Sequence, residues 1–391
     1  MMIPRILSNK LLQLSRKMPV ICLTGPRQSG KTMLVKNVLH DYAYINLEQL
    51  EVRHFAQQDP KGFLKSLPTG VIIDEAQYVP EIFSYIQVAV DESRRNGEFI
   101  LTGSQNFQLS AHISQSLAGR AANLYLLPFS SEELNTSGLL PDDYEQILFQ
   151  GSYPRVYDQK IEPGDFYPSY IENYVERDVR QLLNVSDLGK FQIFIRLCAS
   201  RIGQQLNLSS ISVEAGVDAN TVKRWFSILE SSFIAFKLQP YFKNYNKRLT
   251  KTPKIFFYDT GLVCSLLGIR TEAQLEAHSI KGALFENFIQ VETMKQYYHR
   301  GIRPMTYYWR DHVGLEIDLI IDDGGRIIPV EIKSGRTIQP DFFKNIGIFN
   351  KISGSSPEKS HIIYGGQEHQ VRSQGTVSGW RKMPVWLEQS I

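Results

Sequence analysis

The sequence predicts an α/β fold whose first part is an open parallel sheet. The phosphate-binding pattern GxxxxGK[ST] lies between an apolar run at 20–23 and an amphipathic stretch at 33–39. A second apolar run, at 71–73, ends in two acids. Strand and helix patterns alternate over residues 1–135, as a parallel sheet with helical crossovers requires.

The phosphate-binding pattern predicts a loop between a buried strand and a helix. It consists of Gly25, Pro26, Arg27, Gln28, Ser29, Gly30, Lys31 and Thr32. Glycines let the backbone wrap the phosphates, and N–H groups at the helix N-terminus meet their negative charge. We expect Lys31 to reach the β- and γ-phosphates and Thr32 to offer its hydroxyl to Mg²⁺. The alternative is a chance glycine-rich turn before a helix.

The acidic strand end predicts the other half of this site. The carboxyl ends of parallel strands meet at one edge of a sheet, so both acids should lie near the loop. Asp74 is expected to bind Mg²⁺, directly or through water, and Glu75 to polarise the attacking water as a general base. Taken alone, an apolar run followed by two acids is often only a strand end.

A third strand, at 98–105, ends in polar side chains. We expect it to lie between the two earlier strands as a sensor strand, where Ser104 or Gln105 would contact the γ-phosphate or the attacking water. Ser104 serves equally well as the cap of a following helix.

Arg120 follows a glycine at the end of a helical stretch. It is a candidate arginine finger, which would reach the nucleotide of a neighbouring subunit, and it is the reason to expect a homo-oligomer. A surface arginine near a helix end is the alternative.

The composition is that of an ordinary soluble protein. The 391 residues are too many for one core and predict two to three domains. Three cysteines without a CxxC pair indicate neither a disulfide framework nor a zinc site. The N-terminus lacks a signal-peptide core and no stretch reaches membrane-spanning length, so we expect a cytoplasmic protein. A net charge of +3 is compatible with nucleic-acid contact without demanding it.

The middle of the chain predicts two helical parts. Residues 136–186 have helical patterns and predict a small lid or linker. Residues 187–255 predict a winged helix domain, with a glycine turn before Asp218, the expected N-cap of the third helix. The apolar stretch 233–238 and the residues 240–242 predict its wing hairpin.

The last helix of this winged helix would carry two cations. Lys223 and Arg224 lie on it and are expected to meet a DNA backbone. A winged helix used only for packing or protein contact is the alternative.

Residues 256–391 predict a further α/β domain with acids on a hairpin. Strands at 315–321 and 327–333 flank a turn at 322–325. Period two puts Glu331 and Lys333 on one face, and Asp318 on the partner strand can join them. Carboxylates bind Mg²⁺, and a lysine can orient a water or steady the charge of a phosphoryl group. A hairpin of solvated charge pairs is the alternative.

A helix at 282–289 would bring Glu286 to the same place. The metal ligands expected in this domain are therefore Glu286, Asp318 and Glu331, with Lys333 as a catalytic residue. This D…ExK arrangement is that of the PD-(D/E)xK nucleases, and a fold of that kind used for binding without cleavage is a third possibility.

Motifs along nearly the whole chain carry a family resemblance. They are GPRQSGKT, VIIDEAQ, ILTGSQ, SLAGR, YVERDVRQLLNVSDLGKF, TVKRWFSILE, KIFFYDTGL, GALFENF, EIDLII and IPVEIKSG. Together they resemble a group of prokaryotic AAA+-type predicted ATPases with a C-terminal domain of unknown function. The resemblance implies ATP binding, an AAA+-like first domain, a central winged helix and a restriction-endonuclease-like fold at the end.

The sequence therefore predicts an ATP- and Mg²⁺-binding hydrolase that acts on DNA. A nucleotide-gated binding module, whose last domain grips DNA or protein without cleaving it, is the rival interpretation. A small P-loop kinase or metabolic enzyme is a third, and the predicted winged helix argues against it.

Overall fold

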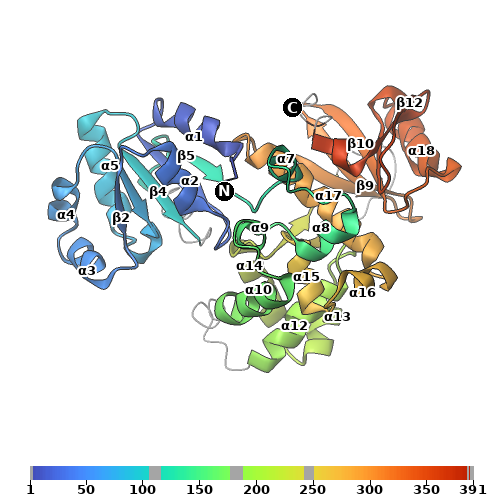
Figure 1. The fold of residues 1–391 in the computed structure, drawn as a ribbon, viewed down its shortest axis with the longest axis horizontal. Coiled ribbons are helices and arrows are strands. Elements are labelled where there is room, and N and C mark those ends of the chain that lie inside the picture. The colour runs from blue at the N-terminus through green and yellow to red at the C-terminus, as the bar shows by residue number, and fades with distance from the viewer. Residues whose placement is uncertain (1–2, 105–115, 177–187, 242–250, 385–386, 388–391) are drawn as a thin grey trace. The chain divides into compact units, whose positions relative to one another are not determined.

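This computed structural model of the chain describes residues 3–104, 116–176, 188–241, 251–384 and 387 (Figure 1). The chain divides into two compact units. The first comprises Met1–Phe129 with the short segments Ser231–Phe233 and Tyr298–Ile302. The second comprises Ser130–Glu230, Ile234–Tyr297 and Arg303–Ile391. None of the described helices is long and apolar enough to cross a lipid bilayer.

The first unit contains a five-stranded sheet in which every pair of neighbours is parallel. Its order is β2 (Ala43–Asn46), β3 (Val71–Asp74), β4 (Phe99–Gly103), β1 (Val20–Thr24) and β5 (Ala121–Tyr125). The three central strands are buried along their whole length, which explains their continuous apolar sequences. The predicted parallel sheet is confirmed, and β4 lies between β1 and β3 as expected.

Helices cover both faces of this sheet. The α-helices in the described part of the unit are α1 (Leu7–Ser15), α2 (Lys31–Val38), α3 (Leu50–Gln58), α4 (Pro60–Ser66) and α5 (Ile82–Ser93).

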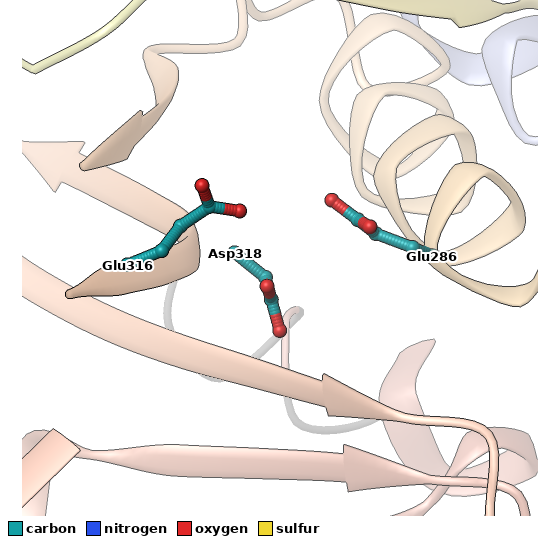
Figure 2. A group of neighbouring side chains, drawn as sticks. All are labelled: Glu286, Glu316 and Asp318. Atoms are coloured by element: carbon teal, nitrogen blue, oxygen red, sulfur yellow. The ribbon is translucent and has the colours of Figure 1, made fainter. Parts of the chain in front are cut away.

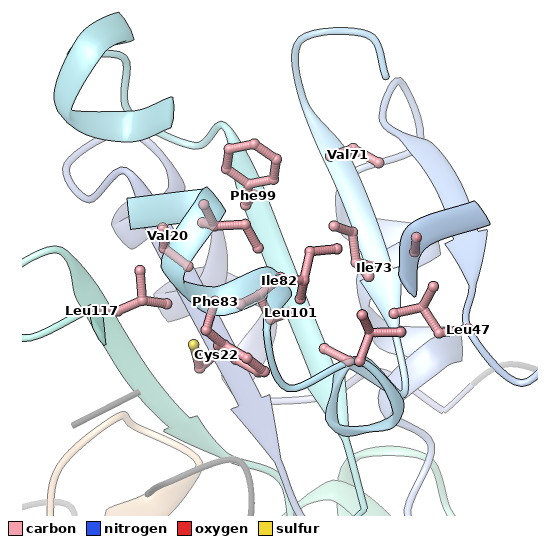
Figure 3. Packing of buried hydrophobic residues seen from close by; sticks show 14 of the residues in the cluster. Val20, Cys22, Leu47, Val71, Ile73, Ile82, Phe83, Phe99, Leu101 and Leu117 are labelled. Carbon is pink, nitrogen blue, oxygen red and sulfur yellow. The ribbon is translucent and has the colours of Figure 1, made fainter. Parts of the chain in front are cut away.

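Alternate residues of β1 enter two different cores. Val20 and Cys22 pack with α3, α4 and α5, as Figure 3 shows for α5, whereas Ile21 and Leu23 pack with α1 and α2. This period of two is the signature of a strand with two buried faces. Since helices fill both faces, the carboxyl edge of the sheet is where polar loops can gather.

The second unit begins with short helices. They are α7 (Ser131–Thr136), α8 (Tyr144–Gln150), α9 (Pro154–Asp158) and α10 (Pro163–Tyr170), followed by a π-helical turn at Ile171–Glu176. The capping box of Ser130 and Glu133 starts α7, as the Ser-x-x-Glu spacing predicts.

Three helices and a two-stranded ribbon follow. The helices are α12 (Leu188–Ser200), α13 (Leu208–Ala215) and α14 (Ala219–Ser231), and the last of them begins directly after Asp218, its predicted N-cap. Gly216, with φ 65°, makes the turn between α13 and α14, and the Asp218 carboxylate accepts a hydrogen bond from the Thr221 N–H at 3.0 Å.

The ribbon differs from the predicted wing. β6 (Ala235–Leu238) pairs antiparallel with β7 (Lys254–Phe257), and the described residues of the predicted return, Pro240 and Tyr241, do not pair with β6. Pro240 has no N–H to donate to a ladder, and Tyr241 instead donates its N–H to the carbonyl of Tyr308 at 2.7 Å. Phe242, the last residue of the predicted return, lies outside the described residues.

The rest of the second unit is a mixed sheet with helices. The six strands, in spatial order, are β12 (His369–Arg372), β13 (Gly375–Gly379), β11 (His361–Tyr364), β10 (Arg326–Lys333), β9 (Glu316–Asp323) and β8 (Thr306–Arg310). The helices are α15 (Thr260–Leu266), α16 (Glu272–Ala277), α17 (Lys281–Tyr298) and α18 (Lys344–Ser353). Strands β8 to β10 are antiparallel, while β10, β11 and β13 run parallel.

The predicted hairpin is confirmed, with a tighter turn than expected. Asp323 pairs with Arg326, so only Gly324 and Gly325 form the loop. Their φ angles are 59° and 94°, as a two-residue turn of this kind requires.

A buried ion pair stabilises the second unit. Lys295 Nζ lies 2.8 Å from Glu292 Oε1, and both side chains on α17 are nearly fully buried. Lys295 also donates to Ser152 Oγ at 2.9 Å, and Glu292 Oε2 accepts from the Ser131 N–H at 2.7 Å. The pair therefore ties α17 to two segments more than a hundred residues earlier in the chain.

We expect Glu292→Ala to lower the free energy of unfolding by about 3–5 kcal/mol, because it leaves the Lys295 ammonium buried without its carboxylate. Urea unfolding followed by circular dichroism measures the loss. The control is Glu214→Ala, which removes the more exposed pair with Arg201 and should lower the free energy of unfolding far less. Equal losses for the two variants would contradict the assigned role.

Candidate functional site

The phosphate-binding loop joins β1 to α2 at the carboxyl edge of the sheet. Gly30 precedes the first residue of α2 with a φ of 94°, a conformation that favours glycine. A Cβ at Gly25 would lie 2.1 Å from the carbonyl oxygen of Leu126, so only glycine fits there. Two of the loop's glycines are thus explained by backbone geometry.

Lys31 is buried with its ammonium inside the loop. Its Nζ donates to the carbonyls of Gly25 at 2.9 Å and Pro26 at 2.7 Å. Burial lowers the pKa of Lys31 to about 8, although the nearby carboxylates of Glu75 and Asp74 oppose this shift. The ammonium thus lies among the backbone groups that are expected to surround phosphate oxygens.

Asp74 accepts hydrogen bonds from three elements at the sheet edge. Its Oδ2 accepts from Thr32 Oγ1 at 2.8 Å and from the Tyr44 hydroxyl at 2.6 Å, and its Oδ1 accepts from Thr102 Oγ1. Burial and the hydrogen bond to Asp74 raise the pKa of Tyr44, so its hydroxyl stays protonated and donates. Asp74 thereby connects α2, β2 and β4.

Glu75 follows Asp74 with a left-handed backbone, φ 54° and ψ 45°. Its Oε2 accepts hydrogen bonds from the amide of Gln77 and from Ser104 Oγ at 3.2 Å. The structure therefore brings Ser104 to Glu75, whereas Gln105, its predicted alternative, lies outside the described residues.

The residues of the loop fit a phosphate and a magnesium ion. Ser29 Oγ is buried and, among the described residues, has no hydrogen-bond partner, which suits a donor kept for a phosphate oxygen. Thr32 Oγ1 and Asp74 Oδ2 lie 2.8 Å apart, and both are the hard oxygen ligands that Mg²⁺ prefers.

Arg120 lies away from this edge. It immediately precedes β5, whose first residue pairs with Val20 at the start of β1, so it is at the opposite end of the strands from the loop. Its guanidinium binds Asp91 of α5 at 2.5 and 2.8 Å. Within its own subunit Arg120 therefore forms a surface ion pair, the alternative that its sequence context allows.

A second group of acids lies in the second unit. Glu286 on α17 and the β9 residues Glu316 and Asp318 point their carboxylates toward one another (Figure 2), with oxygens within 4.8 Å. Period two puts Glu316 and Asp318 on one face of β9. Glu286 and Asp318 were predicted to meet, whereas Glu316 was not predicted.

Glu331 and Lys333 adjoin Asp318 from β10. Lys333 Nζ lies 2.6 Å from Glu331 Oε2 and 3.9 Å from Asp318 Oδ2. Glu331 is almost fully buried, and its Oε1 has no partner among the described residues. Burial and the neighbouring Asp318 carboxylate raise the pKa of Glu331 well above its usual range.

Lys254 of β7 lies among the three carboxylates. Its Nζ is 3.0 Å from Glu286 Oε1 and also binds Glu316 Oε1, and the side chain is only 4% exposed. Burial alone would lower the pKa of Lys254, but the carboxylates of Glu286 and Glu316 together raise it above its usual value. The donor chemistry suits a divalent cation, but with Lys254 in this position the cluster does not fit one.

Comparisons with known proteins agree with this division of the chain. Residues 17–135 match the family described as an AAA domain. Over these residues the chain is similar to AAA domains. Two families described as domains of unknown function, DUF8612 and DUF4143, match residues 141–273 and 281–383. The resemblance to prokaryotic AAA+-type ATPases with a C-terminal domain of unknown function is confirmed.

Similar proteins are known in several bacteria. An uncharacterized protein of Mycobacterium tuberculosis is 28% identical over 340 residues, which cover 86% of this chain and 75% of the relative. An uncharacterized protein of Haemophilus influenzae is 23% identical over 349 residues, covering 79% and 81%.

Solved structures similar to this chain include a Walker-type ATPase and a branch migration motor. A Walker-type ATPase of Pyrococcus abyssi gives a TM-score of 0.46 at 17% identity, covering 67% of this chain and 95% of that one. The Thermotoga maritima RuvB Holliday junction branch migration motor gives 0.32 at 17% identity, covering 60% and 90%.

Four residues of the two sites were not predicted from the sequence. Thr102 lies two positions before Ser104 on β4, so the period of a strand could have indicated it. Glu316 could have been found in the same way, two positions before Asp318. Tyr44 and Lys254 come from strands distant in sequence, and no local pattern points to them.

Binding of ATP to the loop of Lys31 should take up protons near pH 8. The phosphates would raise the lowered pKa of Lys31, so about half a proton should be taken up at pH 8 and about a tenth at pH 7. Calorimetry in buffers of different ionisation heat measures this uptake. Proton release, or an uptake independent of pH, would contradict the assigned environment of Lys31.

Proposed function

We propose that this protein binds ATP with Mg²⁺ and hydrolyses it at the loop of Lys31 and Thr32. The observation that supports the proposal is the hydrogen bond between Thr32 and Asp74, which brings two oxygens of the kind that Mg²⁺ prefers to within 2.8 Å of each other. The AAA-domain match over residues 17–135 supports the same activity.

Each residue has a physical role in this proposal. The backbone N–H groups at the start of α2 and the Lys31 ammonium bind the phosphates. Thr32 and Asp74 would hold Mg²⁺, which neutralises charge on the phosphates. Glu75 accepts a proton from the attacking water, and Ser104 positions the Glu75 carboxylate through its hydrogen bond.

Arg120 is proposed to act only between subunits. Its place at the far end of the strands from its own loop supports a role in trans, in a homo-oligomer. Particle mass measured with and without ATP tests this assembly.

ATP turnover should depend on Lys31 and Glu75. Glu75→Gln is expected to slow phosphate release about 10²- to 10⁴-fold while ATP still binds, because the general base is lost. Lys31→Ala should weaken ATP binding as well, since a cation at the phosphates is removed. Phosphate release and ATP affinity are measured on the full chain.

The matched controls are Glu51→Gln and Lys65→Ala, which change exposed residues of α3 and α4 in the same unit. Phosphate release that is unchanged in Lys31→Ala and Glu75→Gln would refute hydrolysis at this loop. ATP binding with very slow release in the unmodified chain would favour the rival, a nucleotide-gated binding module.

DNA is the proposed partner of the helix pair α13 and α14. The exposed face of α14 carries Asn220, Lys223, Arg224 and Ser227, a polar and basic set suited to phosphate contacts. Arg224 is oriented by its donation to Thr221 Oγ1 at 3.0 Å.

Removal of the two α14 cations should weaken DNA binding uniformly across sequences. The double variant Lys223→Ala/Arg224→Ala should lower the slope of log affinity against log salt by about 2, because two fewer phosphates are neutralised. Fluorescence anisotropy over a salt series measures this slope. Lys344→Ala/Lys351→Ala on α18 is the control of equal charge, and an identical effect in both would refute a specific α14 interface.

For the C-terminal domain we propose partner binding without cleavage. The position of Lys254 among Glu286, Glu316 and Asp318 supports this choice, because the chain itself supplies the cation there. The catalytic assignment of Lys333 stays a prediction, which DNA incubated with Mn²⁺ and Lys333→Ala would test.

A further inference from the structure

The acidic cluster of the second unit contains an internal cation. Lys254 extends from β7 and reaches carboxylates on two other elements, Glu286 of α17 and Glu316 of β9. With a side chain only 4% exposed, Lys254 is nearly removed from solvent. A buried ammonium held by two carboxylates is a fixed part of a structure, since removing either charge leaves the other uncompensated.

The charges around Lys254 nearly balance without any metal. Among the described residues four carboxylates meet here, those of Glu286, Glu316, Asp318 and Glu331. Three cations offset them: Lys254, Lys333, and Arg310, whose guanidinium lies 2.8 Å from Glu316 Oε2. Burial and the neighbouring Asp318 raise the pKa of Glu331, so its carboxyl carries less negative charge than the other three. A divalent ion added to this set would therefore leave an excess of positive charge.

One unsatisfied acceptor remains beside the cluster. Glu331 Oε1 is buried and has no partner among the described residues, and its carboxylate adjoins Asp318. Buried polar atoms without a partner are uncommon, and an ion is among the groups that can satisfy them. The position next to Asp318 is therefore where an entering cation would gain most.

We propose that Lys254 is the resident cation of this cluster, and that a divalent cation binds Glu286 and Asp318 only by displacing it. The ammonium and a metal ion compete because both need the Glu286 carboxylate, and the two positive charges repel each other at this range. This inference concerns the second unit alone and does not depend on ATP hydrolysis.

The fold connects Lys254 to the helix-turn-helix segment. β7 pairs with β6, which follows α14, and Gln205, between α12 and α13, also bridges to Lys254. The Gly203 backbone lies against Glu286, since a Cβ there would be 3.1 Å from Glu286 Oε2. A shift of the β6–β7 ribbon would move the Lys254 ammonium out of the cluster. Whether the cluster can bind a metal ion would then depend on the position of α13 and α14.

Metal binding to the full chain tests the proposal. Free Mn²⁺ is counted by electron paramagnetic resonance, without nucleotide, for the unmodified chain and for Lys254→Met, which keeps the length of the side chain and removes its charge. Lys254→Met should gain a Mn²⁺ site at least about tenfold tighter than any in the unmodified chain. Adding Asp318→Asn should abolish the gain, which distinguishes this cluster from the phosphate loop.

Lys237→Met is the matched control, because Lys237 lies on β6 of the same ribbon and pairs with Glu230 outside the cluster. The proposal is overturned if folded Lys254→Met binds Mn²⁺ no tighter than the unmodified chain, or if Lys237→Met shows the same gain. If Lys254→Met does not fold, Lys254→Met/Glu316→Gln is compared with Glu316→Gln alone. The same tenfold gain is then expected, and its absence overturns the proposal.

Discussion

A single buried carboxylate organises the edge of the first sheet. Asp74 must be compensated, and three hydroxyls from different elements do this, those of Thr32, Tyr44 and Thr102. A buried anion without these donors would cost several kcal/mol, so their positions are coupled to that of Asp74. The start of α2, the end of β4 and β2 are thereby held together, and any ion that enters beside Asp74 meets a preorganised set of oxygens.

The second unit buries ammonium groups and compensates them in a similar way. Lys295 and Lys254 are both nearly excluded from water, yet each lies against carboxylates from α17. Of the two pairs, that of Lys295 and Glu292 ties segments together, whereas Lys254 lies in a cluster with the chemistry of a cation site. Helix α17 thus takes part in two buried ion pairs. That of Glu292 with Lys295 stabilises the fold, whereas opening that of Glu286 with Lys254 would free a carboxylate for a metal ion.

Features that depend on local sequence patterns could be predicted from the sequence. The loop ending in Lys31 and Thr32, the strand ending in Asp74 and the glycine turn of the β9–β10 hairpin could be predicted, because each rests on backbone geometry or on period two. Lys254 could not be, because its role depends on how a ribbon packs against a helix and a strand far along the chain. The predicted wing hairpin was wrong for a related reason. The segment after Pro240 forms hydrogen bonds with β8, and the strand that pairs with β6 begins only at Lys254.

The backbone of Glu75 has a consequence for the evolution of the site. A non-glycine residue at φ 54° is strained by about 1 kcal/mol, and glycine or asparagine would adopt this backbone conformation at a lower energy. Stability and chemistry therefore oppose each other at this position, so directed selection for heat resistance alone should tend to replace Glu75. A stabilised variant obtained in that way would keep the fold and lose the carboxylate that faces Ser104.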